Sequence, residues 1–273
     1  MLRTRVITAC ILLVLFLVAV FLLPVLVWSA LVIAMVMQGT LEWMRLSKMS
    51  GKTAYLYGWL TLTLMLVIVW LDWQHPDGNV QLHLIIYGLS ALLWLVVVPT
   101  WLLAAWRVQS TLLMALTGWA LLIPIGLAMM DLRALGPWWL LGVMGLVWTA
   151  DIGAYFFGRK FGKTRLAPRI SPGKTWEGVA GALLCATVYV LMGGFFSDQS
   201  VLRDRLPVLI IAGWCGVALA VIGDLFESAI KRQAGVKDSG ALLPGHGGLL
   251  DRIDAMTSTL PLAAMVLLLQ GLS

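Results

Sequence analysis

The chain has 273 residues, of which 61% are hydrophobic and only 12% are charged, and its formal net charge is +6. Because an ordinary soluble domain carries roughly 25% charged residues, this composition excludes a soluble globular protein and indicates an integral membrane protein. The three cysteines lie in apolar segments without paired spacing, so they predict neither a disulfide framework nor a zinc site.

The first apolar run extends from Val6 to Leu41 without a charged residue. A helix rises about 1.5 Å per residue and a bilayer core is roughly 30 Å thick, so this run is too long for one crossing. We therefore expect two helices joined near Pro24. Arg3 and Arg5 precede the run as in a signal peptide, but no soluble domain follows it, which favours an uncleaved anchor.

Further apolar segments of membrane-spanning length lie near residues 53–71, 80–106, 110–130, 137–157, 176–196, 206–226 and 249–270. With the first pair they predict an all-α, polytopic integral membrane protein of about nine transmembrane helices. If the N-terminus is cytoplasmic, every Lys and Arg except Arg133, Arg203 and Arg205 falls on the cytoplasmic side, as the positive-inside rule prefers. That basic face suits anionic headgroups or a phosphorylated substrate.

The polar residues divide the chain into two regions. Residues 1–145 are apolar helices with short loops, and we interpret them as a membrane scaffold and a candidate for dimer contacts. Within this region His75 and His83 have no metal-like spacing, so we expect loop and interface roles for them. Residues 146–273 contain four polar clusters and are expected to form the catalytic membrane region with cytoplasmic loops.

The first two clusters are TADIGAYFFGRKFGK at 149–163 and RISPGKTWEG at 169–178. In the first, Asp151 lies within an apolar span and shares a helical face with Tyr155 and Gly158. The second predicts a cytoplasmic loop that holds an anion, with substrate-binding candidates at Ser171, Lys174 and Thr175. Both clusters contain a G-K-T sequence, but the earlier glycine that a P-loop requires is absent from each.

The third cluster, GDLFESAIKR at 223–232, aligns Asp224, Glu227, Ser228 and Lys231 on one helical face. The fourth joins the loop QAGVKDSGALLPGHGG to a helix in which Asp251 and Asp254 stand three residues apart. Its loop glycines precede that helix, where exposed backbone N–H groups and the positive end of the helix dipole can receive phosphate.

These residue types indicate phosphoryl or nucleotidyl transfer. Asp224 and Asp251, with Asp254 and Asp151 as further candidates, offer the hard oxygen ligands that Mg²⁺ prefers beside substrate phosphates. The positive charges that would face phosphate are Lys174, Lys231, Arg232, Lys237 and Arg252. An alternative interpretation is that ion pairs such as Asp251 with Lys231 only hold helices together. A second alternative, from another class, is a cation-coupled transporter.

The run SAIKRQAGVKDSGALLPGHGGLLDRID, from Ser228 to Asp254, resembles the signature of the phosphatidate cytidylyltransferases, also called CDP-diacylglycerol synthases. TADIGAYFFGRKFGK and ISPGKTWEG also resemble this family. The matching signature positions are Ser228, Lys231, Arg232, Lys237, Asp238, Pro244 to Gly248, Asp251, Arg252 and Asp254.

The resemblance implies a bacterial inner-membrane enzyme that joins CTP and phosphatidate into CDP-diacylglycerol and releases pyrophosphate. It also implies a magnesium-dependent homodimer, with room for a second cation, whose active site faces the cytoplasm and whose metal ligands are Asp224 and Asp251. The expected catalytic residues are Asp224, Lys231, Arg232, Lys237, Asp251 and Asp254. The expected substrate-binding residues are Asp151, Ser171, Lys174, Thr175, Ser228, His246, Gly247, Gly248 and Arg252. A related enzyme acting on another lipid phosphate stays open.

Overall fold

A computed structural model describes residues 2–75, 79–196, 204–242 and 247–271 of the chain. Its first helices are α1 (Leu2–Leu22), α2 (Val25–Leu46), α3 (Gly51–Gln74) and α4 (Val80–Leu92), which continues through the π-helical turn η1 (Leu93–Val97) into α5 (Val98–Ala104). There follow α6 (Thr111–Leu135), α7 (Pro137–Phe161), α8 (Trp176–Phe196), α10 (Leu206–Ala234) and α11 (Leu250–Leu269). Strands β1 (Arg165–Ala167) and β2 (Ser171–Thr175) form an antiparallel hairpin between α7 and α8.

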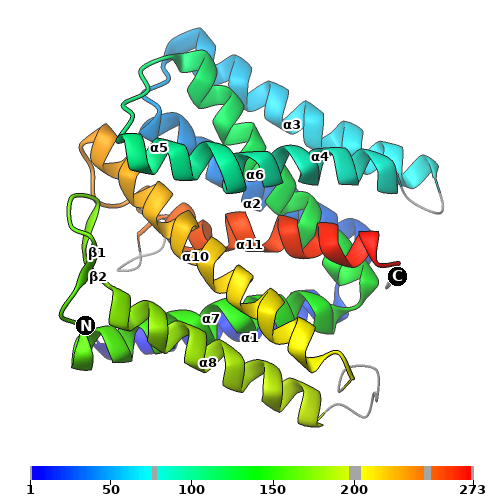
Figure 1. Cartoon of the computed structure of the whole chain (residues 1–273). Coiled ribbons are helices and arrows are strands. Elements are labelled where there is room, and N and C mark those ends of the chain that lie inside the picture. The colour runs from blue at the N-terminus through cyan, green and yellow to red at the C-terminus, as the bar shows by residue number, and fades with distance from the viewer. Residues whose placement is uncertain (1, 76–78, 197–203, 243–246, 272–273) are drawn as a thin grey trace.

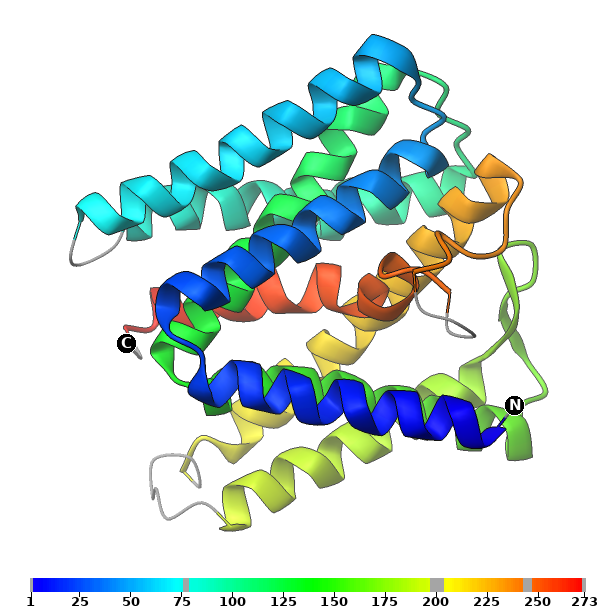
Figure 2. The ribbon, with the colours of Figure 1, turned by 180° about the vertical axis from the view of Figure 1, so that it is seen from behind.

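The predicted all-α, polytopic membrane fold is confirmed. Within the described residues, 8 helices are long and apolar enough to cross a membrane, and α1 adds a shorter apolar stretch at Leu13–Leu22. The start of α1, the hairpin and the end of α10 lie at one end of the bundle, whereas α11 ends at the other (Figures 1 and 2). Within the loop expected at 169–178, Ser171–Thr175 form β2 and α8 begins at Trp176.

Helix α11 lies in the middle of the bundle, where it packs against α10, α6, α4 and α7 (Figure 1). Every residue from Ala255 to Leu262 is buried. The hydroxyls in this stretch are satisfied: Ser258 Oγ donates to the carbonyl of Leu219 in α10 at 2.8 Å, and Thr259 Oγ1 donates to the carbonyl of Ala255 at 3.0 Å. The packed middle of α11 therefore holds its first turn in a fixed position.

The helical structure is interrupted between α1 and α2 at the predicted proline. Helix α1 ends at Leu22 and Pro24 precedes α2. Arg133, at the end of α6, donates from Nε to the carbonyl of Val20 at 2.7 Å and from its guanidinium to the carbonyl of Leu23. The same guanidinium lies 5.0 Å from the ring centroid of Trp28. A cation thus caps the carbonyl end of α1, where the helix dipole favours positive charge.

Helix α10 continues beyond the apolar segment predicted at 206–226 to Ala234, and Gly235 ends it in a left-handed conformation with φ of 82°. A crossing needs only about 20 residues, so the last turns of this 29-residue helix extend past the apolar span. These turns hold Glu227, Ser228 and Lys231 in one rigid segment.

His83 is buried, contrary to the loop and interface role expected for it. Its Nε2 lies 2.9 Å from Asp72 Oδ1 and its Nδ1 lies 2.8 Å from Asp131 Oδ2. Tyr87 also donates to Asp131 Oδ2, at 2.7 Å. These contacts join α3, α4 and α6, so this histidine connects helices in the N-terminal half.

Candidate active site

The polar face predicted along α10 is confirmed by its own contacts. Ser228 Oγ donates to Asp224 Oδ1 at 3.3 Å, and Lys231 Nζ donates to Glu227 Oε2 at 2.9 Å. Both pairs stand four residues apart, which is the separation of neighbours on a helix surface. The helix therefore presents carboxylate, hydroxyl and ammonium groups in one row.

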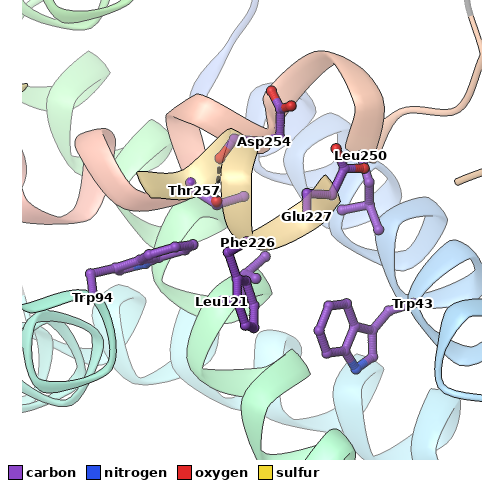
Figure 3. Close-up of a pocket in the computed structure, with 9 residues that line it drawn as sticks. Trp43, Trp94, Leu121, Phe226, Glu227, Leu250, Asp254 and Thr257 are labelled. Carbon is purple, nitrogen blue, oxygen red and sulfur yellow. Dashed lines mark hydrogen bonds between the residues drawn. The ribbon is translucent and has the colours of Figure 1, made fainter. Parts of the chain in front are cut away.

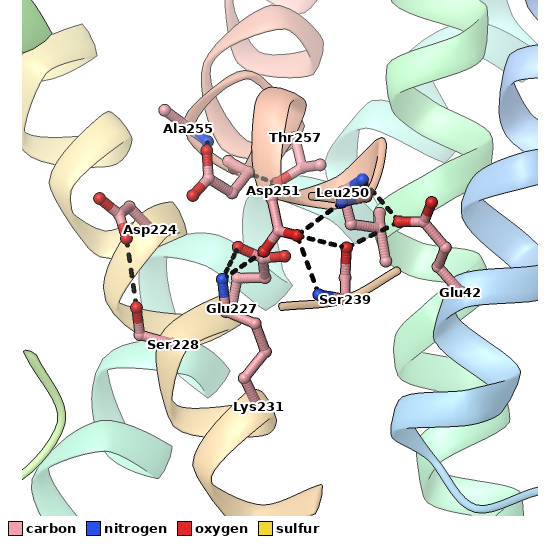
Figure 4. Close-up of polar contacts among 12 residues, drawn as sticks. Glu42, Asp224, Glu227, Ser228, Lys231, Ser239, Leu250, Asp251, Ala255 and Thr257 are labelled. Atoms are coloured by element: carbon pink, nitrogen blue, oxygen red, sulfur yellow. Dashed lines mark hydrogen bonds and ion pairs between the residues drawn. The ribbon is translucent and has the colours of Figure 1, made fainter. Parts of the chain in front are cut away.

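Lys231 joins this row to the first turn of α11. Its Nζ lies 2.6 Å from Asp251 Oδ1 as well as 2.9 Å from Glu227 Oε2 (Figure 4). The side chains of Lys231 and Asp251 are only 12% and 7% exposed. Charges so far from water must be compensated, because an unpaired buried charge costs several kcal/mol. One ammonium therefore contacts carboxylates from two different helices.

The second oxygen of Asp251 fastens the loop that precedes α11. Asp251 Oδ2 accepts hydrogen bonds from Ser239 N at 2.9 Å and Gly248 N at 2.8 Å, and it lies 3.0 Å from Ser239 Oγ. Gly247 has a φ of 84°, and a Cβ there would lie 2.7 Å from Asp251 Oδ2. The glycines of this loop thus leave room for a carboxylate to approach the backbone.

The sequence predicts open backbone N–H groups at the start of α11 for phosphate. In the structure the Gly248 N–H donates to Asp251, and those of Leu249 and Leu250 donate to Glu42 of α2. Carboxylates of Asp251 and Glu42 therefore occupy the positive end of the α11 dipole. Substrate contact by Gly247 and Gly248 stays a prediction.

Asp224 lies in a second, more open group. Its Oδ2 is 2.6 Å from Lys174 Nζ of β2, and the two side chains are 37% and 24% exposed. Asp151 of α7 and Asp254 of α11 both interact electrostatically with Asp224. Side chains of α7, β2 and α11 thus place two further carboxylates and one ammonium near Asp224 of α10.

The oxygen donors around Asp224 fit a magnesium ion. Among the described residues, no three Asp, Glu, His or Cys side chains converge closely enough to enclose a metal ion by themselves. Magnesium is commonly held by one or two carboxylates, with water and substrate phosphates as the other ligands. Asp224 is accessible to a metal ion, whereas at Asp251 a metal ion would have to replace Lys231 as the partner of Oδ1. Metal binding at either residue stays a prediction.

The remaining predicted site residues differ in their surroundings. Thr175 is buried, and its Oγ1 accepts the Gly178 N–H at 3.1 Å, which caps α8. Ser171 is half-buried in β2, as is Ser228 in α10. The cations at Arg232, Lys237 and Arg252 are exposed at the same end of the bundle. His246 lies outside the described residues, as do Pro244 and Gly245 of the same loop.

A small cavity adjoins Glu227 and Asp254 on the inner side of the site (Figure 3). Trp43, Trp94 and Phe226 provide much of its wall. Within the described part of the chain, Glu227 Oε1 has no hydrogen-bond partner. Because its walls are mainly aromatic and aliphatic, this cavity does not suit a charged nucleotide.

Glu42 is the contributor that sequence reasoning missed. It stands in the N-terminal scaffold region, near the cations Arg45 and Lys48. A signal was nevertheless present, because a lone carboxylate inside a membrane-length apolar helix usually faces protein or water and has a function.

Comparison with known proteins covers nearly the whole chain. A model described as the cytidylyltransferase family matches residues 3–270. The chain is similar to a phosphatidate cytidylyltransferase of Haemophilus influenzae, with 36% identity over 96% of each chain. It is also similar to one of Pseudomonas aeruginosa, with 38% identity over 99% of this chain and 98% of the relative. Another, from Staphylococcus saprophyticus, is 44% identical over 50% of this chain and 52% of the relative.

The extent of these matches agrees with the arrangement of the polar groups. Lysines contact aspartates of α10 and α11 at 2.6 Å, which places positive charge where transfer between charged phosphates would use it. The chain therefore belongs to the cytidylyltransferase family.

Proposed function

We propose that the chain is a phosphatidate cytidylyltransferase, which transfers CMP from CTP to phosphatidate and forms CDP-diacylglycerol and pyrophosphate for phospholipid synthesis. Family membership and the near full-length similarity to enzymes of that name support the proposal. The structural observation that carries it is a pair of lysine–aspartate contacts, Lys174 with Asp224 and Lys231 with Asp251, each at 2.6 Å.

The reaction places its demands on positioning and charge. A phosphate oxygen of phosphatidate forms a bond to the α-phosphorus of CTP, while the bond from that phosphorus to the oxygen bridging the β-phosphorus breaks and pyrophosphate leaves. The attacking phosphate is already an anion near neutral pH, so the step needs no general base. Electrostatic stabilisation of the developing charge is then the principal contribution of the protein.

The two lysines suit this task because they are held ready beside the site. Without substrate, Lys174 and Lys231 neutralise Asp224 and Asp251. When substrate phosphates arrive, each ammonium can turn from its carboxylate to a phosphate oxygen without entering a new region of the protein. Arg232, Lys237 and Arg252 add positive charge that offsets repulsion between two polyanionic substrates.

We further propose that Asp224 and Asp251 hold Mg²⁺, with Asp151 and Asp254 beside Asp224. A bound Mg²⁺ supplies charge neutralisation for the triphosphate and the leaving pyrophosphate. Its arrival would also balance the two carboxylates once the lysines turn away. The hard oxygen chemistry of this donor set supports magnesium over a softer metal.

The expected location is the bacterial inner membrane, with the N-terminus and the active site facing the cytoplasm and the protein forming a homodimer. The relatives come from bacteria, and the 8 membrane-length helices among the described residues support a membrane location. The cations of the hairpin and of the end of α10 support the orientation, since cytoplasmic segments carry the excess of Lys and Arg. A lipid phosphate could then stay in the headgroup layer while CTP arrives from water.

The test is to incubate the purified protein with CTP labelled at the α-phosphate, Mg²⁺ and phosphatidate in detergent. Label should enter the lipid phase and pyrophosphate should be released in equal amount. A reaction without phosphatidate is the control. Absence of lipid label from folded protein would contradict the proposal.

Two alternatives give different results in the same preparation. An isoprenoid ether-lipid phosphate that accepts label in place of phosphatidate would assign the other lipid substrate. Ion flux into proteoliposomes without CTP consumption would instead assign the transporter, which nothing in the family comparison favours.

A further inference from the structure

Glu42 is completely buried, with 0% of its surface exposed, and it lies in the part of the chain that the sequence assigns to a scaffold. Its carboxylate reaches the loop and the first turn of α11 (Figure 4). A buried carboxylate is costly unless its oxygens are hydrogen-bonded, so its partners decide what it does.

Four donors surround the Glu42 carboxylate, two on each oxygen. Oε1 accepts from Leu249 N at 2.8 Å and from Gln38 Nε2 at 3.0 Å. Oε2 accepts from Leu250 N at 2.9 Å and from Ser239 Oγ at 2.7 Å. An ionised carboxylate offers about four acceptor sites, so these donors fill it. The positive end of the α11 dipole favours the same charge.

The surrounding glycines fit this arrangement. A Cβ on Gly240 would lie 2.9 Å from Glu42 Oε1. A Cβ on Gly248 would collide with both Ser239 Oγ and Glu42 Oε2. Both positions therefore exclude a side chain because the carboxylate comes so close to the loop backbone.

Ser239 connects Glu42 to the site. Its hydroxyl lies 2.7 Å from Glu42 Oε2 and 3.0 Å from Asp251 Oδ2, and its backbone N–H donates to the same Asp251 oxygen at 2.9 Å. Asp251 in turn holds Lys231 at 2.6 Å. A continuous chain of contacts thus leads from α2 through the loop to the lysine of α10.

We propose that Glu42 is a positioning residue for cytidylyl transfer: it fixes the first turn of α11 and, through Ser239, sets the orientation of Asp251. The inference rests on the proposed function for its activity readout. Glu42 is assigned positioning and not catalysis, because it is completely buried and its oxygens are enclosed by protein donors.

The decisive variant is Glu42→Gln, which keeps the size of the side chain and removes its charge. Each carboxylate oxygen accepts one backbone N–H, so either orientation of the amide places an NH₂ group against a backbone donor. Since small misplacements of catalytic groups cost up to about 100-fold in rate, we expect kcat to fall roughly 10- to 100-fold. Glu42→Asp, which keeps the charge, should retain more activity than Glu42→Gln.

A double variant tests the route through Ser239. If Glu42 acts through that hydroxyl, Glu42→Gln combined with Ser239→Ala should be within about twofold of Glu42→Gln alone, because coupled residues are not additive. Independent effects would instead multiply. The control is Trp119→Phe, which removes a hydrogen bond to Thr61 Oγ1 between α6 and α3 and should lower stability with kcat unchanged.

Hydrogen exchange provides a readout that does not depend on activity. The amides of Leu249 and Leu250 should exchange faster in Glu42→Gln than in the unchanged protein, and Trp119→Phe should leave them unaltered. If the wild-type protein labels no lipid, the proposed function is refuted. The hydrogen-exchange result would still test the contacts of Glu42.

A wild-type kcat in folded Glu42→Gln would overturn the inference. Equal values of kcat in Glu42→Asp and Glu42→Gln would also overturn it. If Glu42→Gln does not fold, Ser239→Ala and Glu42→Asp decide: wild-type kcat in both, with unaltered exchange at Leu249 and Leu250, also overturns it.

Discussion

Replacing Asp224 or Asp251 by asparagine should abolish transfer in both cases. Only the change at Asp251 should destabilise the protein substantially. The two aspartates have the same lysine contact distance of 2.6 Å, yet their surroundings differ. The side chain of Asp251 is 7% exposed and its second oxygen accepts two backbone hydrogen bonds and lies 3.0 Å from Ser239 Oγ, whereas the side chain of Asp224 is 37% exposed.

The cost at Asp251 follows from its contacts. An asparagine there can keep its carbonyl oxygen toward Ser239 and Gly248, but its NH₂ group then faces the ammonium of Lys231. Breaking a buried ion pair costs about 3–5 kcal/mol, and Glu227 still holds Lys231, so the lower end, about 3 kcal/mol, is expected. The Asp224 pair is solvent-accessible on both sides, and its loss should cost only about 0–1 kcal/mol.

The assay combines thermal unfolding in detergent with CTP-dependent pyrophosphate release. Loss of an electrostatic group at a phosphate site typically costs on the order of 10²–10³ in kcat, so both variants should be nearly inactive. Asp204→Asn, an exposed change outside both pairs, is the matched control for both measurements. Equal melting temperatures for Asp224→Asn and Asp251→Asn, or near wild-type turnover in either, would refute the reasoning.

Further changes test other parts of the structure. Gly248→Ala should cost about 1–3 kcal/mol and most of the activity, because its Cβ would collide with Ser239 and Glu42; wild-type stability and turnover would contradict this packing. Arg133→Met should cost about 1.5–3 kcal/mol by removing the cap on the carbonyl of Val20, with turnover retained because that contact lies at the opposite end of the bundle; unfolding and turnover measurements check it. Chelation of Mg²⁺ by EDTA should stop pyrophosphate release, and added Mg²⁺ should restore it; turnover that persists after chelation would exclude the metal proposal.

Local spacing explains what the sequence predicts well. The face shared by Asp224, Ser228 and Lys231 depends only on the helical repeat, and the hydrogen bonds along α10 confirm it. The number and length of the apolar helices depend on hydropathy and bilayer thickness, so they too could be predicted without tertiary contacts.

Contacts between distant segments could not be predicted in this way. Lys174 was expected to face phosphate, and the structure brings it to Asp224 from the preceding hairpin. The start of α11 was expected to be open, but its N–H groups donate to carboxylates, one of which comes from a residue 208 positions earlier in the chain. No local pattern encodes such a pairing, because it arises only when α2 packs beside the loop and α11.

The division between a scaffold and a catalytic region stays a prediction, but the contacts of Glu42 bear on it. The signature from Ser228 to Asp254 lies within α10, α11 and the loop between them, yet Ser239 and Leu249 of that region are hydrogen-bonded to Glu42 of α2. Without Glu42, Asp251 would keep its hydrogen bonds to Ser239 N and Gly248 N. Ser239 and the first turn of α11 would lose their hydrogen bonds to the Glu42 carboxylate. A C-terminal fragment containing every signature residue would therefore lack Glu42 and its hydrogen bonds to Ser239, Leu249 and Leu250.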